Sequence, residues 1–211
     1  AIPPHRLMKI TILCYGDSNT RGFVPLSTGN QRYETDQRWT GLLQTDLGDK
    51  YDIIEEGLDA RTTNIDDPRP GFVGKNGMTY LVPCLDSHKP INLVIFMLGT
   101  PDLKALFNRS CEQITSGMED LIKLATQTNI LVVSPPLLIE STEFAQELFK
   151  GGGEKSARLS SHYERLADQY HCGFVSGEDC EVDKQEGVHL TIKGHRMMFE
   201  RINAYIKNLK I

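Results

Sequence analysis

A serine near the beginning of the chain and a histidine near its end are the residues best suited to covalent chemistry. Ser18 follows a short apolar run at residues 10–15, and Glu186 precedes His189 by three residues. Serine, histidine and an acid on separate segments can form an activated nucleophile, in which the histidine removes the serine proton and the acid orients the ring. The pattern predicts acyl transfer by Ser18, His189 and Glu186, with Asp183 as the alternative acid.

Both segments also have a purely structural interpretation. The sequence Gly-Asp-Ser-Asn at residues 16–19 contains only residue types that favour turns. The alternative for His189 is a loop histidine that caps the following helix. The nucleophile elbow of ordinary α/β-hydrolases, G-x-S-x-G, is absent, because Thr20 stands at the position of its second glycine. The local sequence therefore leaves both a turn and a catalytic serine open.

The elements that must position these residues alternate along the chain. Short apolar segments predict strands at residues 10–15, 52–56, 92–98, 130–133 and 174–175, and apolar residues at helical spacing predict helices at 39–47, 78–85, 112–126, 154–170 and 191–209. This alternation predicts a parallel sheet covered by helices on both faces. Ligands of such sheets bind at the carboxyl ends of the strands. Ser18 directly follows the first strand and is therefore expected at that edge.

Two long polar loops are expected at residues 21–37 and 60–76. Loops of this length without regular structure are often functional. In the second loop, we expect Arg61 to be an exposed arginine that holds the loop together rather than a ligand contact. Trp39 is the only tryptophan, and general burial trends favour a role in the core over a substrate contact.

An insert at residues 137–153 follows the fourth strand. Within it, Phe144, Leu148 and Phe149 have helical spacing. This spacing favours core packing, while a channel lining or a subunit contact remains open. The insert is compatible with a homo-oligomer.

Composition restricts the function further. The net charge of −5, without a basic block, argues against nucleic acid as a partner. No apolar run approaches the roughly 18 residues of a membrane span.

The five cysteines are odd in number and scattered along the chain. They suggest neither a disulfide framework nor a metal site, and a cytoplasmic location is therefore expected. Residues 8–211 are expected to form a single domain, with residues 1–7 as a tail or remnant.

The remaining histidines have no neighbouring acid of the kind that accompanies His189. We expect all of them at the surface: His5, His88, His162, His171 and His195.

Four short blocks occur in a fixed order along the chain. They are Gly16-Asp17-Ser18, the isolated Gly57, Gly99-Thr100-Pro101-Asp102, and Glu186-x-x-His189. Longer matching segments lie at residues 38–41, 55–58, 60–68, 97–100 and 132–136. In these blocks and segments the chain resembles the GDSL, or SGNH, hydrolases, and in particular their bacterial arylesterase/acyltransferase branch.

The resemblance implies a flavodoxin-like, three-layer α/β/α sandwich around a five-stranded parallel sheet. It implies a serine esterase that hydrolyses short-chain aryl or alkyl esters through an acyl-enzyme, and that can pass the acyl group to alcohols or peroxide. The backbone N–H groups of Ser18 and Gly57 would bind the oxyanion. The expected partner is a small-molecule ester, and no cofactor or metal is expected.

Two positions depart from the family pattern. Glu186 stands where the family normally has aspartate, which shifts geometry without removing the acid. Pro101 stands at the asparagine position, so that one oxyanion donor is lost. Such a loss typically lowers the rate by about 10²–10³. Three explanations for Pro101 remain open: a naturally weak esterase, a site adapted to other substrates, and an engineered substitution.

Two alternative functions also remain open. One is a degenerate protein that binds an acylated or carbohydrate ligand, and the other is a carbohydrate acetylesterase.

Overall fold

The computed structural model describes residues 8–210, and five parallel strands form its sheet. The strands are β1 (Ile10–Gly16), β2 (Tyr51–Gly57), β3 (Leu93–Met97), β4 (Asn129–Ser134) and β5 (Gly173–Ser176), in the spatial order β2-β1-β3-β4-β5. All four strand pairs are parallel, as the sequence predicts. The expected tail at residues 1–7, including His5, lies outside the described residues.

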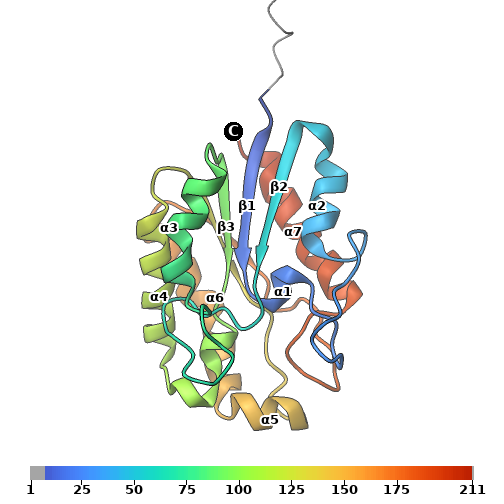
Figure 1. Cartoon of the computed structure of the whole chain (residues 1–211), viewed down its shortest axis with the longest axis vertical. Helices are drawn as coiled ribbons and strands as arrows, with labels where there is room; N and C mark the ends of the chain where they lie inside the picture. Colours follow the sequence, from blue (N-terminus) through green and yellow to red (C-terminus); the bar gives the residue numbers. More distant parts are fainter. Residues whose placement is uncertain (1–7, 211) are drawn as a thin grey trace, which may run out of the picture.

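Helices cover both faces of this sheet (Figure 1). One layer contains α3 (Gly77–His88), α4 (Cys111–Leu124) and α6 (Gly152–Gln169), and the other contains α2 (Trp39–Leu47) and α7 (Ile192–Asn208). Two short helices, α1 (Ser18–Arg21) and α5 (Glu143–Phe149), lie beyond the carboxyl ends of the strands. The predicted three-layer α/β/α architecture is confirmed. Among the helices of residues 8–210, none combines the length and apolarity needed to cross a bilayer.

The sheet separates two hydrophobic cores because neighbouring side chains of a strand point to opposite faces. In β1, Leu13 and Tyr15 belong to the core under α3, α4 and α6. Ile12 and Cys14 belong to the core under α2 and α7, which also contains Trp39. Trp39 is fully buried, so its predicted role in the core is confirmed. All five cysteines are free, as expected.

The predicted elements agree with the observed ones to within about two residues at most ends. The sequence missed α1, because a four-residue helix is too short to show periodicity. Its boundaries nevertheless follow ordinary rules: the Asp17 side chain accepts the N–H of Asn19 as an N-cap, and Gly22 ends the helix with a φ of 91°. The residues with helical spacing in the insert at 137–153 form α5, although no helix boundaries were predicted there.

His195 is a correction to the sequence analysis, because it is fully buried rather than at the surface. It lies in the first turn of α7, and its Nδ1 accepts the backbone N–H of Trp39 at 3.2 Å. The N-cap residue of α2, Arg38, makes no side-chain capping bond, so His195 caps this helix from a neighbouring element. No local pattern predicts this partner, because Trp39 and His195 are 156 positions apart.

Burial, with smaller contributions from His189 and Arg38, lowers the pKa of His195 to about 3. An unfolded histidine binds a proton below a pH of about 6.5. The unfolded chain therefore holds more protons than the folded chain between about pH 6.5 and 3, and stability is lost as the pH falls through this window.

We expect His195→Asn to reduce this acid-side loss of stability, because an asparagine oxygen can accept the Trp39 N–H but cannot be protonated. The measurement is the unfolding midpoint in urea from pH 7.5 to 4 for both proteins. If the difference in urea midpoint between variant and wild type stays the same from pH 7.5 to 4, protonation of His195 is not the cause of the acid-side loss of stability.

Candidate active site

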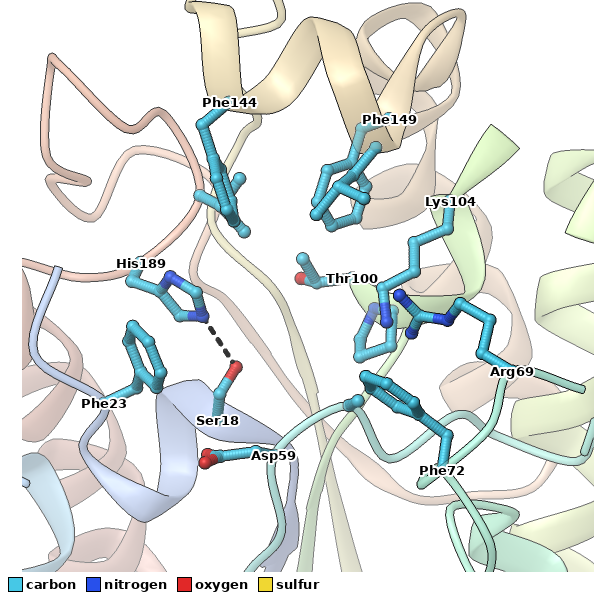
Figure 2. A pocket seen from close by; sticks show the side chains of 14 residues that line it. Ser18, Phe23, Asp59, Arg69, Phe72, Thr100, Lys104, Phe144, Phe149 and His189 are labelled. Atoms are coloured by element: carbon cyan, nitrogen blue, oxygen red, sulfur yellow. Dashed lines mark hydrogen bonds between the residues drawn. The ribbon is translucent and has the colours of Figure 1, made fainter. Parts of the chain in front are cut away.

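The candidate nucleophile, Ser18, lies at the junction of β1 and α1. Ser18 is the first residue of α1, and its side chain is largely buried. Its Oγ lies 2.9 Å from Nε2 of His189, although the two residues are 171 positions apart (Figure 2). The structure thus brings together the serine and the histidine that the sequence selected.

The histidine is held from its other side by Glu186. Nδ1 of His189 donates to Oε1 of Glu186, and the His189 backbone N–H donates to Oε2 at 3.2 Å. With its proton on Nδ1, the imidazole presents the Nε2 lone pair to the Ser18 hydroxyl. Glu186 is 2 % exposed, so water competes little for this carboxylate.

Asp183, the alternative acid, has a different role. Its Oδ1 accepts the backbone N–H groups of Gln185 and Glu186, both at 2.9 Å. Its carboxylate therefore shapes the turn that carries Glu186. The backbone of Glu186 is also fixed by the Thr142 hydroxyl, which donates to its carbonyl at 2.6 Å.

Asn19 connects the segment that carries Ser18 to the loop that carries His189, a role that sequence reasoning missed. Its Oδ1 accepts the N–H of Leu190 at 2.9 Å, and its Nδ2 donates to the carbonyl of Val188 at 3.3 Å. These two bonds bracket His189. The backbone carbonyl of Asn19 also accepts the indole N–H of Trp39 at 3.1 Å. The available signal in the sequence is a polar residue directly after Ser18, which by itself predicts only a turn.

Gly57 pairs with Gly16 at the ends of β2 and β1. A Cβ at Gly57 would lie 2.1 Å from the backbone nitrogen of Arg21, so only glycine lets α1 pack on the end of β2. Gly57 is thereby placed beside the helix that carries Ser18.

Arg61 is a second correction, because it is 2 % exposed rather than a surface residue. Its guanidinium carbon lies 4.1 Å from the centre of the Tyr15 ring. Nη1 donates to the carbonyl of Gly16 at 3.1 Å and to the carbonyl of Glu56. Arg61 does hold its loop, as expected, but it does so by tying the buried ends of β1 and β2 together.

The third block positions a neighbouring loop. Asp102 is fully buried and accepts the backbone N–H and the hydroxyl of Thr63, and Nη1 of Arg109 lies 2.7 Å from its Oδ1. Pro101 begins the 3₁₀ turn Pro101–Leu103 and lines the pocket, where it offers no N–H. Proline suits this first position of a turn, because its nitrogen would have no partner within the turn.

A cavity of about 280 Å³ opens beside Ser18 and His189 (Figure 2). Its walls are mainly apolar, and the ring of Phe23 stacks on His189 with a centroid distance of 4.2 Å. Phe144, Leu148 and Phe149 of the insert line it. Phe149 also belongs to the core and the other two pack against it, so the predicted core packing is confirmed and is combined with a pocket-lining role.

Burial dominates the electrostatics around the nucleophile. It raises the pKa of Asp17 to about 7, while the Asn19 N–H and His189 act in the opposite direction. Burial also raises the pKa of Asp102, against the effect of its bonds to Thr63 and its ion pair with Arg109. The two carboxyl groups that flank Ser18 and Pro101 in the sequence are thus screened little by water.

One group of metal-ligand residue types occurs in the described part of the chain, although the sequence suggested none. Ligand atoms of Glu56, Cys84 and His88 lie within 4.8 Å of one another. His88 is already bonded to Glu56, with Nε2 and Oε1 3.1 Å apart. None of the three lines the cavity beside Ser18.

A buried serine–histidine–glutamate chain at the carboxyl edge of a parallel sheet defines the class of serine hydrolases. The model of the GDSL-like lipase/acylhydrolase family matches residues 14–197. The chain belongs to this family and is a carboxylic ester hydrolase. No curated protein matches it.

Solved structures agree with this assignment. The carbohydrate acetylesterase Est24 from Sinorhizobium meliloti is 38 % identical, with a TM-score of 0.88 over 96 % of this chain and 100 % of that one. The native aryl esterase of M. smegmatis is 37 % identical, with a TM-score of 0.87 over 95 % of this chain and 100 % of that one. The lipase/acylhydrolase from Enterococcus faecalis, at 15 % identity and a TM-score of 0.73 over 94 % of this chain and 95 % of that one, shares the fold.

Proposed function

We propose that the protein hydrolyses short-chain carboxylic esters through an acyl-enzyme formed on Ser18. The observation that carries this proposal is the hydrogen-bonded chain from the Ser18 hydroxyl through the His189 ring to the Glu186 carboxylate. A cavity of about 280 Å³ lies at the small end of the range for ligand sites and favours short acyl and alcohol groups.

The chemistry proceeds in two stages. His189 Nε2 takes the proton of Ser18 as Oγ attacks the ester carbonyl, and Glu186 stabilises the resulting imidazolium. The same proton then passes to the departing alcohol, which leaves an ester on Ser18. Water, activated by His189, releases the acid and restores the serine. An alcohol or peroxide in place of water gives acyl transfer, which is part of the proposal.

The tetrahedral intermediate needs donors for its oxyanion. We assign this role to the backbone N–H groups of Ser18 and Gly57, which lie at adjoining ends of α1 and β2. Pro101 stands at the position of a third, side-chain donor and supplies none. The expected enzyme is therefore a weak esterase rather than an inactive ligand-binding protein, because two of the three donors remain.

A carbohydrate acetylesterase is the second candidate, supported by the 38 % identity to Est24. Acetate release from acetylated xylo-oligosaccharides, compared with 4-nitrophenyl acetate, separates the two substrate classes.

We further propose that residues 8–211 form a single catalytic domain that self-associates. Five free cysteines are typical of the cytoplasm, where we expect the protein to act.

The test of the mechanism is covalent labelling. An alkyl 4-nitrophenyl phosphonate mimics the tetrahedral intermediate and should add once to the wild-type protein, with the adduct on the peptide that contains Ser18. Mass spectrometry of the intact and digested protein measures this, and Ser18→Ala is the control. Absence of an adduct, or equal labelling of Ser18→Ala, would contradict an activated serine.

A further inference from the structure

The cavity has two chemically different ends (Figure 2). Ser18, His189 and Asp59, which pairs with Arg21 at 3.3 Å, lie at one end, and the side chains of Arg69 and Lys104 project at the other. Phe72 also lies at this second end, with the centre of its ring 3.7 Å from the guanidinium carbon of Arg69. Hydrolysis of a neutral ester does not require two basic groups at the far end of the pocket.

The two cations at this end share one carboxylate. Arg69 donates to both oxygens of Asp67, through Nε at 2.9 Å and Nη2 at 2.6 Å. Nζ of Lys104 lies 3.9 Å from Oδ2 of the same carboxylate, beyond hydrogen-bond distance. The Asp67 side chain is fully buried and the Lys104 side chain is 7 % exposed. Arg69 therefore engages Asp67, and the lysine charge is only partly compensated.

The other acids near Lys104 do not pair with it. Asp102 is engaged by Thr63 and Arg109. Asp17, with a pKa of about 7, is only partly ionised near neutral pH. Burial and then Arg69 lower the pKa of Lys104 to about 8, against the effect of Asp67, Asp17 and Asp102. The ammonium is still largely protonated at pH 7, in a poorly hydrated position that favours an added anion.

The mechanism decides which part of the substrate reaches this end. The leaving oxygen must lie within reach of His189 Nε2, because that nitrogen supplies its proton. The alcohol therefore departs on the side of His189. On the side of Ser18 away from His189, the cavity leads to Lys104 and Arg69 (Figure 2), and we assign the acyl chain to that side.

We propose that Lys104 and Arg69 bind a carboxylate at the far end of the acyl group, so that the preferred substrates are monoesters of short dicarboxylic acids. This inference rests on the proposed function, because the side of the acyl chain is assigned from the Ser18–His189 geometry. The bound carboxylate takes no part in bond making or breaking. Water still divides the ester into a dicarboxylic acid and an alcohol.

The test compares each monoester with a neutral analogue of nearly the same shape. Monoethyl succinate carries a carboxylate oxygen where ethyl levulinate carries a methyl group. Both esters release ethanol. The same comparison uses monoethyl malonate with ethyl acetoacetate and monoethyl glutarate with ethyl 5-oxohexanoate. For at least one chain length, kcat/KM should favour the charged ester by about 10- to 100-fold, as expected for a hydrogen bond between charged groups.

Lys104→Met should bring this ratio to about one, and Lys104→Arg should keep most of it, because the arginine retains the positive charge. Lys123→Met, an exposed lysine on α4, is the matched control and should leave the ratio unchanged. A wild-type ratio of one or less at all three lengths, or an equal ratio in wild type and Lys104→Met, would overturn the proposal.

Binding separates this inference from the proposed function. Calorimetry on Ser18→Ala should show tighter binding of the charged monoester than of its neutral analogue, and Lys104→Met in the same background should abolish the difference. If wild type hydrolyses none of the esters but this difference is present, the proposed function fails and the carboxylate site stands. Equal binding of both compounds overturns the carboxylate site even if hydrolysis is observed.

Discussion

Replacing Glu186 by glutamine is expected to lower kcat for ester hydrolysis about 10⁴-fold, the typical cost when the triad acid becomes neutral. The carboxylate accepts the Nδ1 proton of His189 and is 2 % exposed. A glutamine amide can instead donate to Nδ1, which places the ring proton on Nε2. The ring then faces Ser18 with a donor and cannot remove its proton. Stopped-time assays with 4-nitrophenyl acetate measure the loss.

Asp183→Asn is the matched control for this prediction. Asp183 accepts two backbone N–H groups through Oδ1, and an asparagine oxygen can do the same. We expect a loss of less than about tenfold, because the turn survives. Equal losses in the two variants would show that Glu186 acts only through the shape of the loop. An unimpaired Glu186→Gln enzyme would remove Glu186 from the triad.

Replacing Pro101 by asparagine is expected to raise kcat by about 10²–10³, the usual worth of one oxyanion donor. Pro101 lines the same cavity as Ser18 and His189, so a side-chain amide at this position can enter the site. The 3₁₀ turn begins at residue 101 and does not require proline there. The comparison is kcat for 4-nitrophenyl acetate in wild type and variant.

Pro101→Ala separates a new donor from a moved loop. Alanine removes the ring without adding a side-chain amide, so it should gain little. A similar gain in both variants would assign the effect to loop position. No gain in Pro101→Asn would mean that residue 101 does not face the oxyanion.

The sheet and its helices were predictable because their signals are local. Five apolar runs and five amphipathic segments establish the element order, and the observed strands and helices follow it. The short helix α1 was not predictable from periodicity, because Ser18–Arg21 is barely one turn long. Helix α5 was hidden in an insert whose apolar residues serve the core and the cavity at once.

Site residues could be predicted where the residue type and its place in the order of motifs indicate the chemistry. Ser18, Glu186 and His189 were selected in this way, and the structure places them in contact. Residues that act through partners distant in sequence were missed or misplaced. Asn19 bonds to residues 188 and 190, and His195 caps a helix 156 positions away. Such pairs become visible only when the topology is known.

The contact between Ser18 and His189 spans 171 positions, and almost every strand lies between them in the sequence. Closing so large a loop is entropically costly, and it becomes favourable only when the intervening strands have paired. A nascent chain that still lacks Glu186 and His189 cannot assemble this site. Turnover should therefore appear late during synthesis or refolding, after compaction, and can report on completion of the native state.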